Sequence, residues 1–406
     1  MKVGKIISSV LIALALSLLV AAYPARANSA KWTIMVYMAA DNNLDPAGLD
    51  DISEMQMVGS SNDVNIVVLF DRWGEACGFN GTVLLHIEKN TNITIWGGWS
   101  SEYELNMGDP ETLKWFINYT IEQYPAEKYA LILWDHGGNW EGICWDWTEN
   151  DHLTIEEVKI AVSESAIKHI DLLGFDACLM ASIEVAYTIS LTDKVGVMVA
   201  SEDFIPWDGW PYDLILSGLT ENPEWSAEEF SIFIVDNYIA SYSHGTQGFA
   251  WFVTLSAINL TEVKTLVGQM ADLTGEILAD FNKYKPAMTA AKSSADRYWF
   301  GFWHQGPYID LYQFIFTLGT INNKLTSYTA PILEKWNEVV IHAGACNGPH
   351  VDSANGLTIY FPRNRNLFYT PEPYYESVPE FAEETKWYEL LTTYFTKSKK
   401  PLTILL

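Results

Sequence analysis

Short apolar runs alternate with amphipathic stretches along most of this chain, and that alternation restricts the fold more than any other feature. The runs are nearly continuous in apolar residues, as strands buried on both faces of a sheet are. They cover residues 33–40, 65–71, 129–134, 172–175 and 195–200. Amphipathic helices are expected between them, at residues 110–124, 154–169 and 179–191. The pattern predicts an α/β fold with a mostly parallel sheet and helices on both faces.

The remaining segments extend this scheme. Residues 81–95 alternate polar and apolar side chains, which predicts hairpin strands. Beyond residue 220 we expect helices at residues 226–242 and 262–281, around residue 311 and at 331–343, strands at 248–255 and 356–361, and a C-terminal helix. We therefore divide the mature chain into a core, residues 28–220, and a C-terminal α/β portion, residues 221–406, packed on that core.

The first residues have the pattern of an export signal. Lys2 and Lys5 precede an apolar run at residues 6–22, and small residues, Ala25 and Ala27, follow at the positions that a signal peptidase reads. We expect residues 1–27 to be a signal peptide and the mature protein to be secreted or extracytoplasmic. The alternative is an uncleaved membrane anchor, and membrane contact is expected only in that case.

The charge balance excludes one class of partner. The chain has 51 acidic residues against 24 Lys and Arg, a formal net charge of -27. Such a surface repels phosphate backbones, so nucleic acid is not an expected partner. The charge favours cationic substrates or divalent cations, and a solubilising acidic surface is the alternative interpretation.

Four cysteines are present, Cys77, Cys144, Cys178 and Cys346. Their spacing matches no structural zinc pattern. In an exported protein they would form two disulfides, or at least one would be a free thiol with a function. His342 and His350 flank Cys346, and we interpret this group as structural rather than as a metal site.

Two predicted strands end in residue types that suit nucleophilic catalysis. The strand at residues 129–134 leads into His136 and two glycines, and the strand at residues 172–175 leads into Cys178. In open α/β sheets the reactive groups lie just beyond the carboxyl ends of the strands. We therefore interpret His136 and Cys178 as one candidate site.

The expected position of Cys178 predicts a reactive thiol. With a helix starting at residue 179, Cys178 would lie at a helix N-terminus, where the dipole lowers a thiol pKa. His136 would hold or take the thiol proton, as thiol acyl transfer requires. The backbone N–H groups of Gly137 and Cys178 would stabilise the oxyanion of a tetrahedral intermediate. The alternative is a buried structural cysteine and a histidine whose hydrogen bonds are satisfied within its loop.

At these residues the sequence resembles the clostripain family of cysteine peptidases, which shares its fold with caspases, legumain and gingipains. Five motifs carry the resemblance, in order along most of the mature chain. They are WTIMVYMAADNNL at 32–44, LWDHGG at 133–138, DACLMA at 176–181, SE at 201–202 with GWPY at 209–212, and GLTIYFP at 356–362. The resemblance implies a caspase-like sandwich in which His136 and Cys178 form the catalytic dyad.

The same resemblance implies an endopeptidase that prefers Arg or Lys before the scissile bond. In the family an acidic residue two positions before the catalytic cysteine lies at the base of the pocket, which here is Asp176. A carboxylate is a suitable partner for a guanidinium group. Asp203 and Asp208 would form a second acidic wall or are solvated loop charges. An inactive scaffold that binds peptides or calcium and a transpeptidase are the rival interpretations.

No cofactor is required for thiol chemistry, but the resemblance implies calcium as an ancillary ion. Hard cations bind several oxygen ligands. The best local candidates are the stretch with Asp146, Asn150 and Asp151 and the loop with Asp203 and Asp208, and a solvated loop is the alternative for each.

The expected partner is a peptide or protein substrate with basic residues. Family members are often zymogens that cut themselves after a basic residue beyond the catalytic histidine. Residues 137–158 contain no Lys or Arg, so self-cleavage is not expected there. The protein would be active as a single chain or be processed elsewhere.

Overall fold

The structure, a computed structural model, describes residues 29–74, 81–90, 104–298, 306–348, 354–368 and 376–396. The expected signal peptide, residues 1–27, lies outside these ranges, as do Cys77, His350 and the second half of the hairpin expected at residues 81–95. Within the described ranges, no helix has the length and apolar character that crossing a membrane requires.

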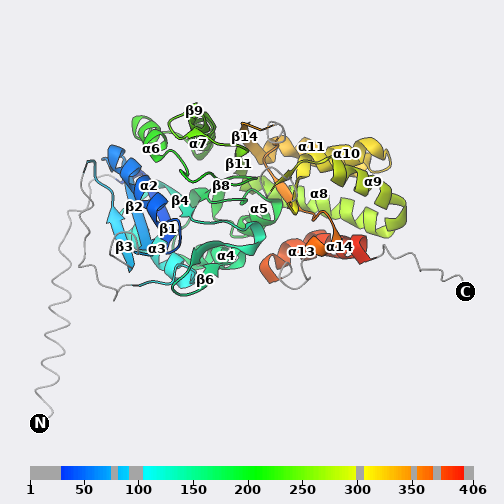
Figure 1. Ribbon diagram of the computed structural model, residues 1–406, viewed down its shortest axis with the longest axis horizontal. Helices are drawn as coiled ribbons and strands as arrows, with labels where there is room; N and C mark the ends of the chain where they lie inside the picture. The colour runs from blue at the N-terminus through cyan, green and yellow to red at the C-terminus, as the bar shows by residue number, and fades with distance from the viewer. Residues whose placement is uncertain are drawn as a thin grey trace, which may run out of the picture.

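An eight-stranded sheet forms the centre of the molecule (Figure 1), with strand order β14-β11-β8-β7-β4-β1-β2-β3. Its strands are β1 (Ala30–Ala40), β2 (Val64–Arg72), β3 (Gly81–His86), β4 (Ala126–Trp134), β7 (Ile170–Asp176), β8 (Val195–Ala200), β11 (Val253–Asn259) and β14 (Val340–Cys346). The five from β8 to β2 are parallel, and β3, β11 and β14 pair antiparallel at the two edges. The predicted mostly parallel sheet is confirmed.

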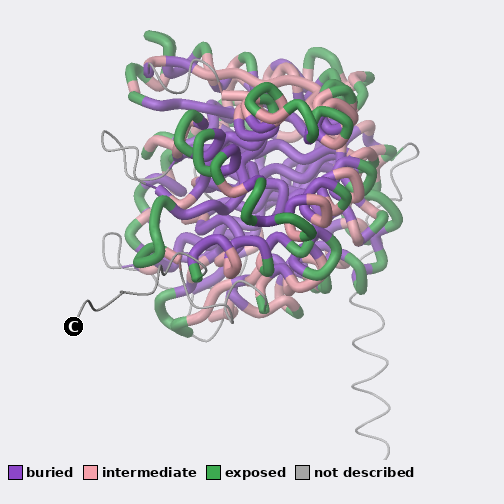
Figure 2. The backbone as a smooth tube through the Cα atoms, turned by 90° about the vertical axis from the view of Figure 1, so that its right-hand side faces the viewer, coloured by how far each residue is buried: buried purple, intermediate pink, exposed green. Residues whose placement is uncertain are grey.

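Helices cover both faces of this sheet, as predicted. One face carries α2 (Asp45–Val58), α6 (Tyr212–Glu221) and α7 (Ala227–Tyr242), and the other carries α3 (Pro110–Gln123), α4 (Ile155–Glu164), α5 (Ile183–Ser190) and α8 (Leu260–Ala279). Successive strand residues point to opposite faces, so Ile132 packs with the first group and Leu133 with the second. Figure 2 shows the resulting buried interior.

The part of the chain beyond residue 220 contributes to the same sheet through β11 and β14. Its other helices lie beside α8 (Figure 1) and are α9 (Phe281–Ser294), α10 (Leu311–Ile321), α11 (Thr326–Val339), α13 (Pro379–Thr385) and α14 (Trp387–Thr396). A small sheet there joins β12 (Arg297–Tyr298), β13 (Tyr308–Asp310) and β15 (Thr358–Tyr360). Two hairpins complete the fold, β5 (Ile143–Asp146) with β6 (Asp151–Leu153) and β9 (Ser243–Gly245) with β10 (Gly248–Phe249). The division at residue 220 stays a prediction.

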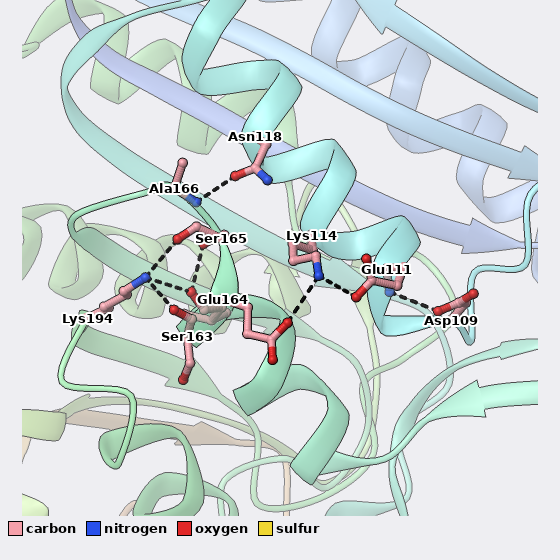
Figure 3. Close-up of polar contacts among 10 residues, drawn as sticks. Asp109, Glu111, Lys114, Asn118, Ser163, Glu164, Ser165, Ala166 and Lys194 are labelled. Atoms are coloured by element: carbon pink, nitrogen blue, oxygen red, sulfur yellow. Dashed lines mark hydrogen bonds and ion pairs between the residues drawn. The ribbon is translucent and has the colours of Figure 1, made fainter.

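The helix expected at residues 154–169 ends earlier, because side chains from other elements bind its C-terminal end (Figure 3). The backbone N–H of Ala166 donates to Asn118 of α3 at 2.7 Å instead of continuing the helix. Lys194 Nζ donates to three backbone carbonyls of this end, and Lys114 of α3 pairs with Glu164 at 3.1 Å. A cation at a helix C-terminus also complements the helix dipole.

Two other predicted elements differ from the structure. The helix expected at residues 331–343 ends at Val339, because Val340 and the residues after it pair with β11 as strand β14. β-Branched residues such as Val340 and Ile341 suit a strand. The single strand expected at residues 248–255 is divided into β10 and β11 by a turn in which Phe252 has a φ of 62°.

A buried ion pair fixes the start of α2 to the end of β2. Arg72 Nε and Nη2 donate to the two carboxylate oxygens of Asp45 at 2.7 and 2.8 Å, and both side chains are buried. We predict that Arg72→Leu lowers the free energy of unfolding by about 3–5 kcal/mol, because it leaves Asp45 buried without its charge partner. Urea denaturation measures this free energy.

Lys114→Leu is the matched control, because Lys114 forms ion pairs at the surface. Its cost should be about 1 kcal/mol or less. An equally small cost for Arg72→Leu would contradict the role given to the buried pair.

Candidate active site

The parallel strands end at one edge of the sheet, and four loops meet there. They are residues 41–44 after β1, 135–138 after β4, 177–182 after β7 and 201–211 after β8. Trp134 pairs with Asp176 in the parallel register, so His136 and Cys178 each lie two residues beyond the same paired position. The strand order places the Cys178 loop between the His136 loop and residues 201–211. This register brings the loops of His136 and Cys178 to the same edge of the sheet, and their role as one site stays a prediction.

Asn43 binds the imidazole of His136, and the sequence analysis did not assign this role to it. His136 Nε2 lies 2.9 Å from Asn43 Oδ1. The amide oxygen accepts only, so Nε2 carries the hydrogen and Nδ1 presents a lone pair. Burial lowers the pKa of His136 from its usual value, because the imidazolium form loses solvation. The neutral imidazole is therefore ready to accept a proton.

A buried carboxylate holds the His136 loop in place. Asp135 accepts hydrogen bonds from Asn42 Nδ2 at 2.8 Å and from the backbone N–H groups of His136 and Trp145. Asn42 follows β1 and Trp145 lies in β5, so one carboxylate joins three segments of the chain. This network sets the position of His136 relative to the sheet edge.

The helix expected to start next to Cys178 starts later, and that part of the prediction was wrong. Helix α5 begins at Ile183, and Ser182 caps it by accepting from the N–H of Val185. The N–H groups of residues 179 and 181 instead donate to carbonyls of residues 203 and 201. Leu179 has a φ of 70°, which is incompatible with an α-helix. Cys178 thus lies in a loop braced by the segment after β8.

The thiol of Cys178 is in a different electrostatic environment from the one predicted. Burial raises its pKa to about 12, and the carboxylate of Asp203 adds to this effect. The N–H of Ile205 donates to Sγ at 3.3 Å and partly opposes the shift. The predicted lowering by a helix dipole is absent because α5 begins five residues later. Both shifts, the raised pKa of the Cys178 thiol and the lowered pKa of His136, favour the uncharged form of each group.

Gly137 allows the His136 loop and the Cys178 loop to touch. A Cβ atom at residue 137 would lie 2.2 Å from the carbonyl oxygen and 3.0 Å from the amide nitrogen of Cys178. No side chain fits at that distance, so this position requires glycine. The main chains of Gly137 and Cys178 therefore lie directly against one another.

Asp176 lies at the end of β7, and Asp51 of α2 lies close to it. Asp176 Oδ2 accepts from the hydroxyl of Tyr212 at 3.0 Å and from the N–H of Trp210 at 3.2 Å. A Cβ atom at Gly209 would lie 3.2 Å from Asp176 Oδ2 and 3.3 Å from Asp51 Oδ2, so both carboxylates face one glycine. Burial raises the pKa of Asp176 to about 7.

Glu54 extends this acidic group, and it lies one helical turn after Asp51 on α2. It accepts from the N–H of Tyr212 at 2.9 Å and from Gln247 Nε2 at 3.3 Å. Burial raises the pKa of Glu54 to about 7. The sequence analysis missed Asp51 and Glu54 because it did not predict α2, although their spacing places them on one face of any helix there.

Asp203 and Asp208 occupy different environments. Asp203 is buried near the thiol of Cys178, and its carboxylate accepts from the N–H of Phe204 at 2.9 Å. Asp208 is exposed, and its carbonyl accepts from Gln247 Nε2 at 3.0 Å. A role for either residue in substrate binding stays a prediction.

A second acidic cluster lies where β1 and β2 end. It contains Asp41, Asp71, Glu104, Asp146 and Glu149, whose carboxylate oxygens fall into two groups of three within 4.8 Å that share Asp41. One oxygen each of the first three is buried without a hydrogen-bond partner. Burial raises the pKa of Glu104 to about 7 and that of Glu149 to about 8. The nearby cation Arg72 is paired with Asp45 instead.

Two of the described cysteines bear on the disulfide alternative. Cys144 and Cys178 carry free thiols, and two disulfides would need all four cysteines, so that alternative is wrong. His342 Nε2 donates to the Asp236 carboxylate at 2.8 Å, and the structural interpretation of its segment stays a prediction.

Comparison with known proteins gives the family to which this chain is similar. The sequence model of the Clostripain family matches residues 36–394. Clostripain of Hathewaya histolytica is 29% identical over 435 residues, an alignment that covers 89% of this chain and 80% of that protein.

Solved structures show the same fold. A secreted C11 cysteine protease from Bacteroides thetaiotaomicron, in complex with an irreversible peptide inhibitor, has a TM-score of 0.65 at 21% identity, over 88% of this chain and 99% of that one. An inactive zymogen C11 protease from Parabacteroides distasonis has a TM-score of 0.62 at 20% identity. That alignment covers 91% of this chain and 99% of the zymogen chain.

The environment of His136 predicts its titration. We expect its pKa to lie below the usual value of about 6.5, since burial disfavours the charged form. Asn43→Asp should raise that pKa, because a carboxylate would replace the amide oxygen beside Nε2. Histidine NMR titration measures both values, with His136→Gln to assign the resonance. A wild-type His136 that is charged at pH 7 would contradict the geometry.

Proposed function

This chain belongs to the clostripain family and is a cysteine-type endopeptidase, and we propose that it cleaves after Arg or Lys with Cys178 and His136 as a dyad. The observation that carries the proposal is the position of a thiol two residues after the buried carboxyl group of Asp176, which lies close to Asp51. We assign Asp176, Asp51 and Glu54 to the acidic pocket that would receive the basic side chain. Cys178 follows Asp176 by two residues at the end of one strand, so the nucleophile and the pocket have a fixed separation.

The path of the thiol proton follows from the neutral forms of the Cys178 thiol and the His136 imidazole. His136 Nδ1 accepts the thiol proton while Sγ attacks the substrate carbonyl carbon, because a thiol with a raised pKa needs a base as it reacts. The imidazolium then donates that proton to the leaving amine, and a thioester on Cys178 remains. Water hydrolyses the thioester and releases the acid, with His136 again as base. Asn43 keeps Nε2 engaged and so directs Nδ1 to the reacting atoms.

The tetrahedral intermediate needs hydrogen-bond donors for its oxyanion. We assign the N–H groups of Gly137 and Cys178 to this role. Their main chains lie in direct contact, so both amides are fixed before substrate binds.

The acidic pocket supports specificity for a basic side chain. Asp176 and Asp51 are both buried, and Glu54 lies nearby, so the described site gathers three carboxyl groups with no cation paired to them. A buried carboxylate is costly unless it is paired. The guanidinium or ammonium group of the substrate would supply that pair, with Asp176 at the pocket base and exposed Asp208 at its mouth. Asp203 would act indirectly, through the loop that braces Cys178.

Export is part of the proposal. Residues 1–27 have the charged start, apolar run and small-residue end of a signal peptide. The mature peptidase would then meet its protein substrates outside the cytoplasm.

The proposal is tested with fluorogenic peptides that carry Arg, Lys, Asn or Asp before the reporter group. We expect cleavage after Arg or Lys, and a loss of at least about 10³-fold in kcat for Cys178→Ala. Asp176→Asn should lower kcat/KM for the Arg peptide by about 10- to 100-fold, because the pocket loses a charge-assisted hydrogen bond. Cleavage after Asn or Asp instead would overturn the assignment of Asp176 to the pocket, but it would not affect the assignment of Cys178 as the nucleophile.

Asp193→Asn is the control, because Asp193 is exposed and pairs with Lys264. Its kcat/KM should equal that of the wild type. Full activity of Cys178→Ala would overturn the dyad.

The second acidic cluster supports calcium binding. Its donors are carboxylate oxygens, which hard divalent cations prefer. Asp41 and Asp71 are buried, and each has an oxygen without a hydrogen-bond partner, so both fit a cation ligand. Asp146, expected from sequence, is a member, but Asp151 instead accepts from Asn106 at 2.8 Å. When bound, calcium would neutralise the cluster and join β1, β2 and the β5–β6 hairpin.

Calcium should therefore stabilise the folded protein. At a calcium concentration of about 100 times Kd, stability should rise by about 2.7 kcal/mol. The rise appears as a higher Tm in calorimetry, relative to protein treated with a chelator. Asp71→Asn should abolish the increase, and Asp193→Asn should retain it. A wild-type Tm that calcium leaves unchanged would contradict the site.

A further inference from the structure

Four large aromatic side chains are exposed on the segments that border the acidic pocket. Trp207 and Phe204 lie in the loop after β8, with 53 and 40% of their surface exposed. Phe249 and Trp251 lie at the end of β10 and just beyond it, with 47 and 54% exposed, and their rings meet edge to face at 4.9 Å. We name these four residues the aromatic rim.

Hydrogen bonds hold the two segments of the rim together. Gln247, in the turn between β9 and β10, donates through Nε2 to the carbonyl of Asp208 and to Glu54. Tyr242, which precedes β9, donates its hydroxyl to the carbonyl of Gly209 at 2.8 Å. The hairpin therefore lies beside the loop after β8 and beside the acidic pocket.

Trp207 lies between the two groups that substrate must reach. Three residues after it, the N–H of Trp210 donates to Asp176, and two residues before it, the N–H of Ile205 donates to Cys178 Sγ. A substrate whose basic side chain reaches Asp176 and whose carbonyl carbon reaches Sγ must lie along this segment. The side chain of Trp207 is thus beside the bound peptide.

The local backbone directs Trp207 outward. The N–H of Gly209 donates to the carbonyl of Pro206 at 3.0 Å, and Gly209 has a φ of 57°, so Trp207 is at the tip of a tight turn. Trp210 is the opposite case, because its indole is fully buried against Gly174, where a Cβ would lie 2.8 Å away. The loop uses one tryptophan as an anchor and presents the other to solvent.

The strand order gives the direction of the peptide along the rim. The Cys178 loop has the His136 loop on one side and the loop after β8 on the other. His136 must protonate the leaving amine, so the residues after the scissile bond extend toward the His136 loop. The residues before that bond therefore extend toward the loop after β8 and the rim.

We propose that the aromatic rim binds an apolar side chain of the residue that precedes the basic residue of the substrate, with Trp207 as the main contact. This inference rests on the proposed function. An exposed aromatic ring gives the largest favourable binding energy when it packs against an apolar side chain of the substrate and both surfaces leave water. The preferred substrate is thus a peptide with an apolar residue directly before Arg or Lys.

The test uses two fluorogenic peptides that differ only in the residue before Arg, which is Leu in one and Ser in the other. We expect the wild type to show a kcat/KM about tenfold higher for the Leu-Arg peptide. Trp207→Ala should remove most of that ratio, because it lowers kcat/KM for the Leu-Arg peptide much more than for the Ser-Arg peptide. Trp207→Phe should retain the preference, because an aromatic face remains.

Trp115→Ala is the matched control, since Trp115 is 44% exposed on α3, on the other face of the sheet. Its ratio should equal that of the wild type. Equal cleavage of the two peptides by the wild type, or an equal loss for both in Trp207→Ala, would overturn the rim and leave the proposed function intact. A wild type that cleaves neither peptide but cleaves after Asn or Asp would overturn the proposed pocket, and the inference with it.

Discussion

The parallel pairing of β7 with β4 on one side and β8 on the other fixes where every proposed reacting group lies. The pairing of Trp134 with Asp176 places His136 and Cys178 at matched positions beyond the sheet edge. Contact between Gly137 and the Cys178 backbone then closes the gap between the two loops. The segment after β8 completes the arrangement, because its carbonyls accept from the Cys178 loop and its N–H groups reach both Sγ and Asp176. The distances that the proposed proton transfer and attack require are thus set mainly by main-chain contacts between these loops.

The second constraint is the burial of negative charge. Asp176, Asp51 and Glu54 are withdrawn from water at one side of the nucleophile, and Asp41 and Asp71 at another. Buried carboxylates without cations cost stability, so each group gains when a positive charge arrives. The protein thereby gathers carboxyl groups of raised pKa at two places, and a basic side chain at one or a metal ion at the other would favour their charged form. Some of the surplus acidic residues in the sequence therefore form these two buried groups, in addition to those that make the surface soluble.

The sequence predicts much of the fold, and it singles out the core of the candidate site, because both follow from local pattern. His136, Cys178 and Asp176 are recognisable since each follows or ends an apolar strand. Asp51, Glu54 and Asn43 were assigned no role, because their contacts join segments far apart in the chain. The start of α5 and the thiol pKa were predicted wrongly for a related reason. The N–H groups that would have begun the helix bind the segment after β8, which no local pattern reveals.

The central claim is that one thiol, Cys178, reacts while a basic side chain occupies the pocket of Asp176. Labelling with a peptide ketone inhibitor that carries Arg next to its reactive carbon, followed by peptide mapping with mass spectrometry, tests this directly. The account predicts a single adduct on Cys178. It should form much more slowly with the same inhibitor carrying Asp in place of Arg, and about 10- to 100-fold more slowly in Asp176→Asn with the Arg inhibitor. Labelling of Cys144 or Cys346, or equal rates for the Arg and Asp inhibitors, would contradict it.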